Sequence, residues 1–155
     1  MPIIENRTKD AKDLELIHPL WVQLNECQHS KAKAFRKHYE LQTFNNRKDC
    51  FKKLAAAGSL MLDLAFDPET ERNIGYCVTS LSQEKTGEIE SIFVEKRYRS
   101  QDISSVLVTR ALAWLEKNGS VRNQVSVGNG NESAFGFYKK FGFYPRMTIF
   151  EQKSE

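Results

Sequence analysis

One stretch of the chain, Gly87 to Gly119, constrains the fold most strongly, because its pattern is that of a strand followed directly by a helix. Its first third, Glu88 to Val94, is rich in β-branched and aromatic residues and predicts a strand. The remainder repeats apolar residues at i, i+3 and i+4 spacing, which is typical of an amphipathic helix. This apolar stripe comprises Ile103, Val106 or Leu107, Ala111, Trp114 and Leu115. Asn118 and Gly119 then form a typical helix C-terminus.

Between the expected strand and helix lies a short polar turn with three cationic side chains, Lys96 to Gln101. A turn that leads from a strand into a helix presents free backbone N–H groups and the positive end of the helix dipole. The sequence therefore predicts an anion-binding site there, and a pyrophosphate is an anion of suitable size.

Two segments resemble the motifs of one protein family. The first segment reads Arg99-Ser100-Gln101-Asp102-Ile103-Ser104, and the second reads NESAFGFYKKFGF from Asn131 to Phe143. They resemble Arg/Gln-x-x-Gly-x-Gly/Ala and Asn-x-x-Ala-x-x-x-Tyr-x-x-x-Gly-Phe, the motifs of the GNAT superfamily of acyl-CoA-dependent N-acyltransferases. Their order and separation are also those of the family. The arginine of the first motif is present, but Asp102 and Ser104 replace its two glycines.

The resemblance implies an N-acetyltransferase that transfers an acetyl group from acetyl-CoA, without a metal, to a primary amine. A polyamine, an amino acid, an antibiotic and a protein lysine all remain possible acceptors, and similar proteins are often dimers. The alternative is a non-catalytic acyl-CoA-binding or sensor domain, which the loss of both glycines favours. The presence of Asn131 and Tyr138 favours the enzyme. A plain interaction protein that shares only the fold has little support.

The resemblance also implies how the cofactor would bind. The backbone of Phe93 and Val94 would pair with the pantetheine arm as an added strand does, and the N–H of Val94 could stabilise an oxyanion. Asn131 would bond the pantetheine, cap the following helix, or do both. Six residues would form the pyrophosphate site, namely Arg99, Ser100, Gln101, Asp102, Ile103 and Ser104. We expect Asp102 to point outward as a helix N-cap; an inward carboxylate would instead repel phosphate.

The family's tyrosine corresponds to Tyr138, which would protonate the departing thiolate, because a phenol is a proton donor at neutral pH. The competing interpretation is that Tyr138 packs among neighbouring aromatic residues. For the base that removes the amine proton, two glutamates share a face of the expected strand. Glu90 is slightly favoured, acting directly or through water, because it lies deeper along the strand. Glu88 corresponds better, by its spacing to Arg99, to the glutamate that is the base in some family members.

The region between the first two helices lies over the acceptor site in similar proteins. Its candidate acceptor-pocket residues are Phe35, His38, Tyr39 and Phe44, although packing of the helices onto the sheet explains each of them equally well. Pro19 predicts a kink or break in the first helix near His18. We expect Asn45 or Asn46 to cap the helix that ends at Gly58.

The remaining patterns complete a β-α-α-β-β-β-α-β-α-β order. The further elements that we expect are strands over 2–8, 59–66, 74–81, 123–127 and 143–152 and a helix over 132–141, with Gly142 as its left-handed C-terminal residue. The fold class is therefore mixed α/β (α+β). A mostly antiparallel central sheet would contain one splayed parallel strand pair and be flanked by about four helices.

Composition limits the remaining possibilities. A chain of 155 residues without linkers or repeats is expected to form one domain over 1–155. A net charge of +3 without dense Lys/Arg clusters gives no support for nucleic-acid binding. Cys27, Cys50 and Cys77 are scattered, which indicates reduced thiols in a cytoplasmic protein and no metal site. We expect no membrane segment, because no apolar run is long enough.

Overall fold

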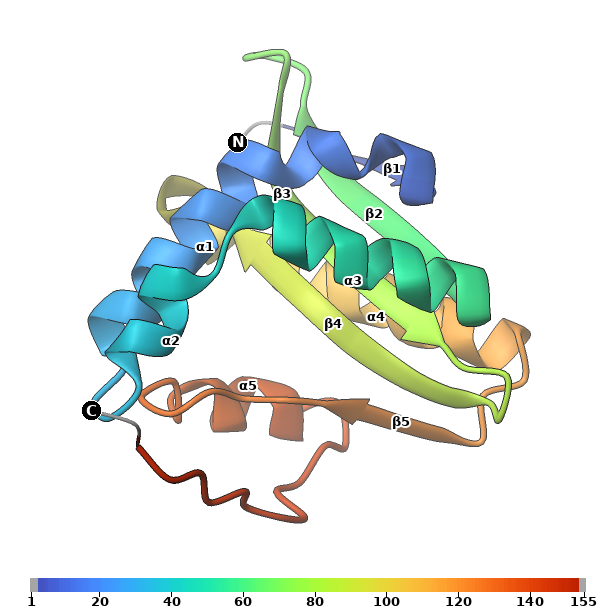
Figure 1. Cartoon of the computed structure of the whole chain (residues 1–155). Helices are drawn as coiled ribbons and strands as arrows, with labels where there is room; N and C mark the ends of the chain where they lie inside the picture. The colour runs from blue at the N-terminus through green and yellow to red at the C-terminus, as the bar shows by residue number, and fades with distance from the viewer. Residues whose placement is uncertain (1–2, 154–155) are drawn as a thin grey trace.

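The computed structural model describes residues 3–153, which form a five-stranded sheet with helices on both faces (Figure 1). The strands lie in chain order: β1 (Glu5–Lys9), β2 (Ser59–Asp67), β3 (Arg72–Leu81), β4 (Thr86–Val94) and β5 (Arg122–Val125). The first three pairings are antiparallel, and β4 pairs with β5 in parallel. The predicted mixed, mostly antiparallel sheet with one parallel pair is confirmed.

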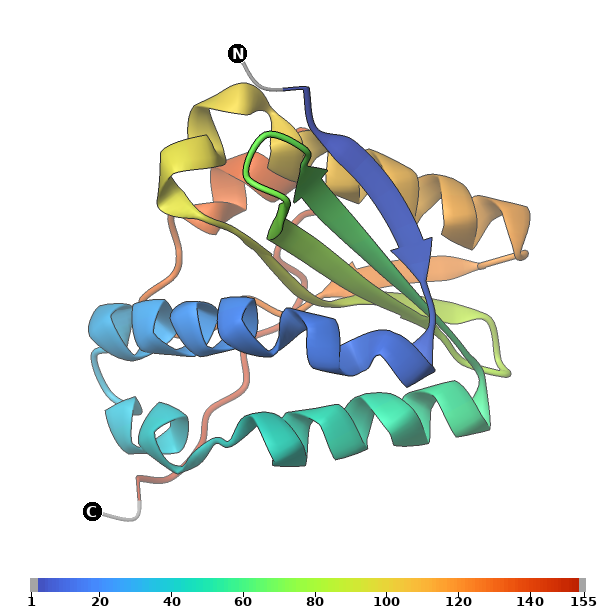
Figure 2. The same cartoon turned by 90° about the horizontal axis from the view of Figure 1, so that it is seen from above.

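The helices divide between the two faces of the sheet. One group is the 3₁₀ helix η1 (Ala11–Ile17), α1 (His18–Lys31), α2 (Arg36–Leu41) and α3 (Phe44–Ala57). The other is the 3₁₀ helix η2 (Lys96–Gln101), α4 (Ile103–Lys117) and α5 (Ala134–Lys139). Figure 2 shows α1 and α3 on one side of the sheet and α4 on the other. Consequently β2 and β3 are buried on both faces, with one apolar cluster on the α1–α3 side and a second on the α4–α5 side.

Helix α4 confirms the strand–turn–helix prediction. Ile103, Leu107, Ala111 and Leu115 repeat every four residues and are buried against the sheet. Between the two alternatives for the second position, Leu107 is fully buried and Val106 is 43% exposed. The helix ends at Lys117 with Asn118 as its C-cap, and Gly119 follows with a φ of +82°, a conformation that favours glycine.

The N-terminal helices begin differently from one another. The predicted break is confirmed, because η1 ends at Ile17 and Pro19 lies in the first turn of α1, where no backbone N–H is needed. The predicted caps of α3, Asn45 and Asn46, are wrong. Thr43 is the N-cap, and its Oγ1 accepts a hydrogen bond from the Asn46 N–H at 3.1 Å.

Both ends of the chain depart from expectation. The first strand runs over 5–9 rather than 2–8, and residue 2 lies outside the described residues. The last helix is shorter than predicted, at Ala134–Lys139, and ends as expected before Gly142, whose φ is +85°. Its N-cap is Ser133, so the predicted cap, Asn131, is wrong. The predicted final strand is wrong: residues 143–153 form no strand. Its apolar side chains, such as Ile149 and Phe150, are exposed, and a strand forms only where another strand satisfies its backbone.

No helix within residues 3–153 has the length and apolar character that a membrane span needs.

Candidate functional site

The parallel strands β4 and β5 separate at one end of the sheet. Their pairing ends at Ile89 opposite Val125, but β4 continues to Val94. The register between β3 and β4 shifts at the same level, leaving Glu90 without a partner in β3. Such a bulge bends a strand, and here it lies where β4 leaves β5.

The separation leaves alternate backbone groups of β4 facing the gap. The N–H of Glu95 donates to the carbonyl of Ile74 at 2.9 Å, so this opposed pair is a hydrogen-bonded one. Because such pairs alternate in antiparallel sheets, the groups of Phe93 point to β3, whereas those of Ile92 and Val94 point away from it. Of the two backbones expected to be available, Val94 therefore faces the gap and Phe93 does not.

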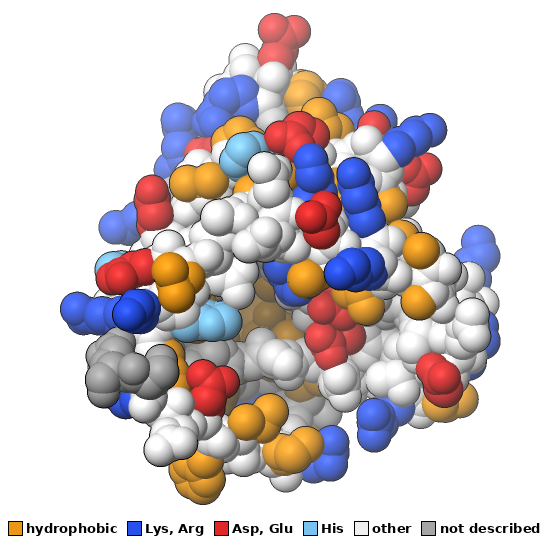
Figure 3. Space-filling model, in the orientation of Figure 1, with side chains coloured by type: hydrophobic (Ala, Val, Ile, Leu, Met, Phe, Trp, Pro, Cys, Tyr) orange, Lys and Arg blue, Asp and Glu red, His pale blue; other side chains and the backbone are white. Residues whose placement is uncertain are grey.

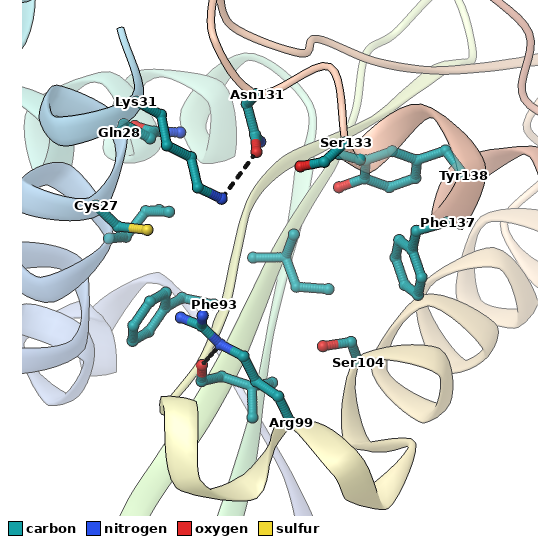
Figure 4. A pocket seen from close by; sticks show the side chains of 14 residues that line it. Cys27, Gln28, Lys31, Phe93, Arg99, Ser104, Asn131, Ser133, Phe137 and Tyr138 are labelled. Carbon is teal, nitrogen blue, oxygen red and sulfur yellow. Dashed lines mark hydrogen bonds between the residues drawn. The ribbon is translucent and has the colours of Figure 1, made fainter.

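A cavity of about 270 Å³ lies beside this end of β4 (Figure 4). It is lined by α1, β4, η2, the start of α4, and the loop and helix that follow β5. Its lining residues are Leu24, Cys27, Gln28, Lys31, Ile92, Phe93, Val94, Arg99, Ser104, Asn131, Ser133, Ala134, Phe137 and Tyr138. The cavity thus collects residues from both motif segments, which are far apart in the sequence.

One side of the cavity is formed by the first motif. Arg99 folds over the end of β4, where its Nε donates to the carbonyl of Val94 at 2.9 Å and its guanidinium lies 5.3 Å from the centre of the Phe93 ring. The Ser104 side chain, in the first turn of α4, also lines the cavity. The side chains of the intervening residues do not line it: Ser100 and Asp102 are exposed, Gln101 is half-buried, and Ile103 is buried in the core.

Asp102 is exposed at the N-cap of α4, as expected, but its side chain accepts no capping hydrogen bond. Its φ of +57° is left-handed, and it stands where the family motif has its first glycine. Aspartate tolerates this conformation better than most residues, yet it still costs about 1–2 kcal/mol relative to glycine. We therefore expect Asp102→Gly to raise the free energy of unfolding by about 1 kcal/mol in denaturant titrations.

Asp102→Ala is the matched control, because it removes the charge but keeps the Cβ. Asp102→Ala should not be more stable than wild type. A more stable alanine variant would contradict the explanation that the left-handed backbone at residue 102 favours glycine. Acetyl-CoA affinity gives a separate result. Tighter binding by both variants would mean that the carboxylate repels the phosphates, whereas unchanged affinity is what an outward Asp102 predicts.

Tyr138 both packs against aromatic rings and reaches the cavity. Its ring makes edge contacts with Phe137 and Phe143, at centroid distances of 5.1 and 6.0 Å. The side chain is 8% exposed, and its hydroxyl points into the cavity without a hydrogen bond to any residue in 3–153 (Figure 4). Burial, assisted by the nearby Cys77 thiol, raises the pKa of Tyr138 to about 12, so the phenol remains protonated at neutral pH.

Glu90 lies at the bulge, in a polar cluster on the α3 side of the sheet. Its carboxylate, 9% exposed, accepts a hydrogen bond from Ser80 Oγ at 2.6 Å. Arg47 of α3 donates to the Glu90 carbonyl at 2.8 Å and lies 3.6 Å from its carboxylate. Burial raises the pKa of Glu90, and the adjacent Glu88 adds to this, against the lowering effects of Ser80 and Arg47.

Glu88 is close to Glu90 but has different surroundings. It lies opposite Gln124 of β5, whose side-chain amide donates a hydrogen bond to it. The Glu88 charge acts on Glu90, so the two side chains are neighbours, as the strand alternation predicts. Neither glutamate lines the cavity.

None of the four predicted acceptor-pocket residues lines the cavity. Phe44 is a core residue, 4% exposed, that packs against Trp21 and His18. His38 and Tyr39 both belong to α2, and their rings contact each other edge to face with centroids 5.0 Å apart. His38 is exposed and Tyr39 is half-buried. Figure 3 shows this side of the molecule hollowed below α3, with hydrophobic atoms in the floor and acidic and His side chains around the rim. Phe35 is half-buried and does not line the cavity.

The α1 wall of the cavity was missed by the sequence reasoning. It comprises Leu24, Cys27, Gln28 and Lys31, which follow i, i+3, i+4, i+7 spacing on one face of α1. That spacing was available as a signal, but Gln28 and Lys31 are polar, and nothing in the local sequence shows that this face of α1 meets a cavity. Residues 3–153 hold no group of three or more His, Cys, Asp and Glu side chains placed to bind a metal ion.

Comparison with known proteins identifies the family. Residues 21–143 match the model of the acetyltransferase (GNAT) family. An uncharacterized N-acetyltransferase of Methanocaldococcus jannaschii is 30% identical over 72 residues, which are 46% of this chain and only 32% of that protein.

Solved structures share the fold at low sequence identity. A GCN5-related N-acetyltransferase from Ralstonia eutropha superposes with a TM-score of 0.75 at 17% identity, covering 99% of this chain and 100% of that one. The aminoglycoside N-acetyltransferase AAC(6')-Iy in complex with CoA has a TM-score of 0.72 at 16% identity, covering 99% and 97%. With the family match extending over most of the sequence, the chain belongs to the GNAT family of acetyltransferases.

Proposed function

We propose that this protein transfers an acetyl group from acetyl-CoA to a primary amine. The observation that carries the proposal is the cavity beside the splayed end of β4, which brings Arg99, Ser104, Asn131 and Tyr138 of the two motif segments together. Because this arrangement unites an anion-binding turn, available strand backbone and a protonated phenol, it has the donor-binding groups and the general acid that thioester aminolysis needs.

The donor would lie along β4. Pantetheine amides would pair with the backbone of Ile92 and the N–H of Val94, since Arg99 already occupies the Val94 carbonyl. The pyrophosphate would meet the first N–H groups of α4. The contributing residues would be Arg99 and Ser104 through their side chains and Ser100, Gln101, Asp102 and Ile103 through the turn backbone. Asn131 would bond the pantetheine from the opposite wall.

The reaction would then proceed by direct attack. The neutral amine nitrogen adds to the thioester carbonyl, and the Val94 N–H stabilises the resulting oxyanion. Glu90 accepts the amine proton through water, because its carboxylate is not in the cavity wall; Glu88 is the alternative base. As the C–S bond breaks, Tyr138 donates its proton to the sulfur of CoA. The products are the N-acetylated amine and CoA.

We expect acetyl-CoA to bind and to stabilise the fold. Free ligand at about 100 times its Kd should add about 2.7 kcal/mol to the free energy of unfolding, which calorimetry and thermal unfolding measure together. Arg99→Gln should weaken binding, while Arg97→Gln, which alters an exposed neighbour outside the cavity, is the control. No heat and no thermal shift at millimolar acetyl-CoA would remove the proposal.

Thiol release with a panel of amines separates the enzyme from the non-catalytic alternative. An acyl-CoA-binding or sensor domain would bind acetyl-CoA but release no CoA with any amine.

A cytoplasmic location remains a prediction, supported by three free thiols, Cys27, Cys50 and Cys77. A homodimer also remains a prediction, and light scattering during size-exclusion chromatography tests it.

A further inference from the structure

Lys31, the last residue of α1, brings a positive charge into the cavity wall. Its Nζ donates a hydrogen bond to the Asn131 side-chain oxygen at 3.3 Å. In Figure 4, Lys31 and Asn131 lie on one side of the cavity, and Arg99 and Ser104 lie on the other. The proposed pyrophosphate site is at Arg99. The acyl group and the acceptor would therefore meet at the other side of the cavity, where Lys31 lies.

Among the residues that the structure describes, no carboxylate compensates this charge. The lining residues include Lys31 and Arg99 but no Asp or Glu. Within residues 3–153, Lys31 has no acidic side chain within 4.0 Å. The nearby Glu132 is engaged elsewhere, because it accepts a hydrogen bond from the Gly130 N–H at 3.0 Å and interacts with Lys33. An ammonium has three donors, and within residues 3–153 only Asn131 accepts from Lys31, which leaves two donors for a ligand.

The main chain around Lys31 is held in place by the loop that follows β5. The Asn129 side-chain oxygen accepts hydrogen bonds from the N–H groups of Lys33 and Ala34, at 3.1 and 3.2 Å. Gly130 packs so closely on the Lys31 carbonyl that an added Cβ would clash with its oxygen. These contacts fix the end of α1 relative to the loop before α5, so the backbone that carries the exposed Lys31 side chain is held beside the cavity.

We propose that Lys31 binds a carboxylate carried by one of the two substrates at the acyl end of the cavity. The inference rests on the proposed acetyltransferase function and names the chemistry that its substrates share. A simple amine would bring only positive charge beside Lys31, whereas an amine that also bears a carboxylate, such as an amino acid, would be attracted. A dicarboxylic acyl group, such as succinyl, would present the same group from the donor.

Initial rates with matched substrate pairs test the proposal and separate the two sources. The acceptor pairs are the standard amino acids and their decarboxylated amines with acetyl-CoA. The donor pair is succinyl-CoA and acetyl-CoA, compared both in turnover and by binding calorimetry. The variants are Lys31→Met, which keeps most of the side-chain length but removes the charge, and Lys33→Met, whose original side chain does not line the cavity.

In one of the two arms, wild type should favour the carboxylate-bearing member by on the order of tenfold to a hundredfold, the range for a charged hydrogen bond. The preference should disappear in Lys31→Met and persist in Lys33→Met. Turnover without any carboxylate preference, or a preference that survives Lys31→Met, would overturn the assignment and leave the acetyltransferase proposal intact. If no CoA is released with any donor and amine, the proposed function itself fails. A Lys31-dependent affinity for succinyl-CoA over acetyl-CoA would then still support the carboxylate site, and its absence would reject it.

Discussion

Replacing Tyr138 by phenylalanine is expected to lower kcat by on the order of 10²–10⁴-fold, the usual contribution of a positioned general acid. The reason is that the Tyr138 hydroxyl points into the cavity without a hydrogen-bond partner among the described residues, while the ring packs against Phe137 and Phe143. Phenylalanine keeps this packing and removes only the proton donor. Acetyl-CoA affinity should therefore change little, because the transition state loses a contact that the bound donor does not make.

Single-turnover kinetics and binding calorimetry on the same variant measure the two quantities separately. Tyr144→Phe is the matched control, since Tyr144 is 72% exposed and does not line the cavity. The pKa of about 12 means that wild-type Tyr138 stays protonated across the accessible pH range. Turnover by Tyr138→Phe at the wild-type rate would show that the tyrosine serves only packing.

The second large effect is expected from Glu90→Gln, which should lower kcat/KM by on the order of 10²–10⁴-fold if Glu90 is the base. In wild type, kcat/KM should rise with pH as Glu90 ionises, because only the carboxylate accepts a proton. This rise should lie above the ordinary range for glutamate, since burial and Glu88 raise the pKa of Glu90. Glutamine keeps the shape and abolishes that ionisation.

Stability measurements test whether Glu90→Gln loses activity simply because the variant is less stably folded. A pKa raised by folding means that the protonated Glu90 stabilises the fold at low pH and that this contribution is lost as pH rises through the folded pKa. Glu90→Gln should thus be at least as stable as wild type at neutral pH, in thermal unfolding. Lower stability at neutral pH would mean that Ser80 and Arg47 need the charge to hold the bulge together.

Glu88→Gln is the matched control for the base. It lies two residues away on the same strand, and Gln124 engages its carboxylate. Its effect should be much smaller, because Glu90 rather than Glu88 occupies the bulge beside the splay. If the pH profile instead moves when the acceptor amine is changed and ignores both glutamates, solvent takes the proton before binding and neither residue is the base.

Local sequence patterns were sufficient for the central part of the fold. Spacings of three and four residues predicted the buried face of α4, with Ile103, Leu107 and Ala111, because a helix orients its side chains by short-range geometry alone. The break at Pro19 and the left-handed Gly142 followed from the backbone restrictions of single residues. The two motif segments likewise predicted the family from residue types and spacing.

The candidate site could be only partly predicted. Its walls come from segments far apart in the sequence, and the local pattern of one segment does not show which other segments it will meet. Arg99, Ser104, Asn131 and Tyr138 were found through the motifs, and all four line the cavity. Lys31 was not, because its relation to Asn131 spans 100 residues along the chain.

What remained was decided by contacts between distant elements. The sequence over 143–152 has the composition of a strand, yet it forms none, because a strand exists only where a neighbour completes its hydrogen bonds. The surroundings of Glu90 depend on a register shift between β3 and β4 and on Arg47, which α3 brings from 43 residues away. The backbone conformation that a segment prefers depends on residues close together in the sequence. The sequence by itself therefore determined the helices, the turns and the two motif segments. The charge, burial and partners of each site residue depend on which segments fold together, and only the tertiary structure decided them.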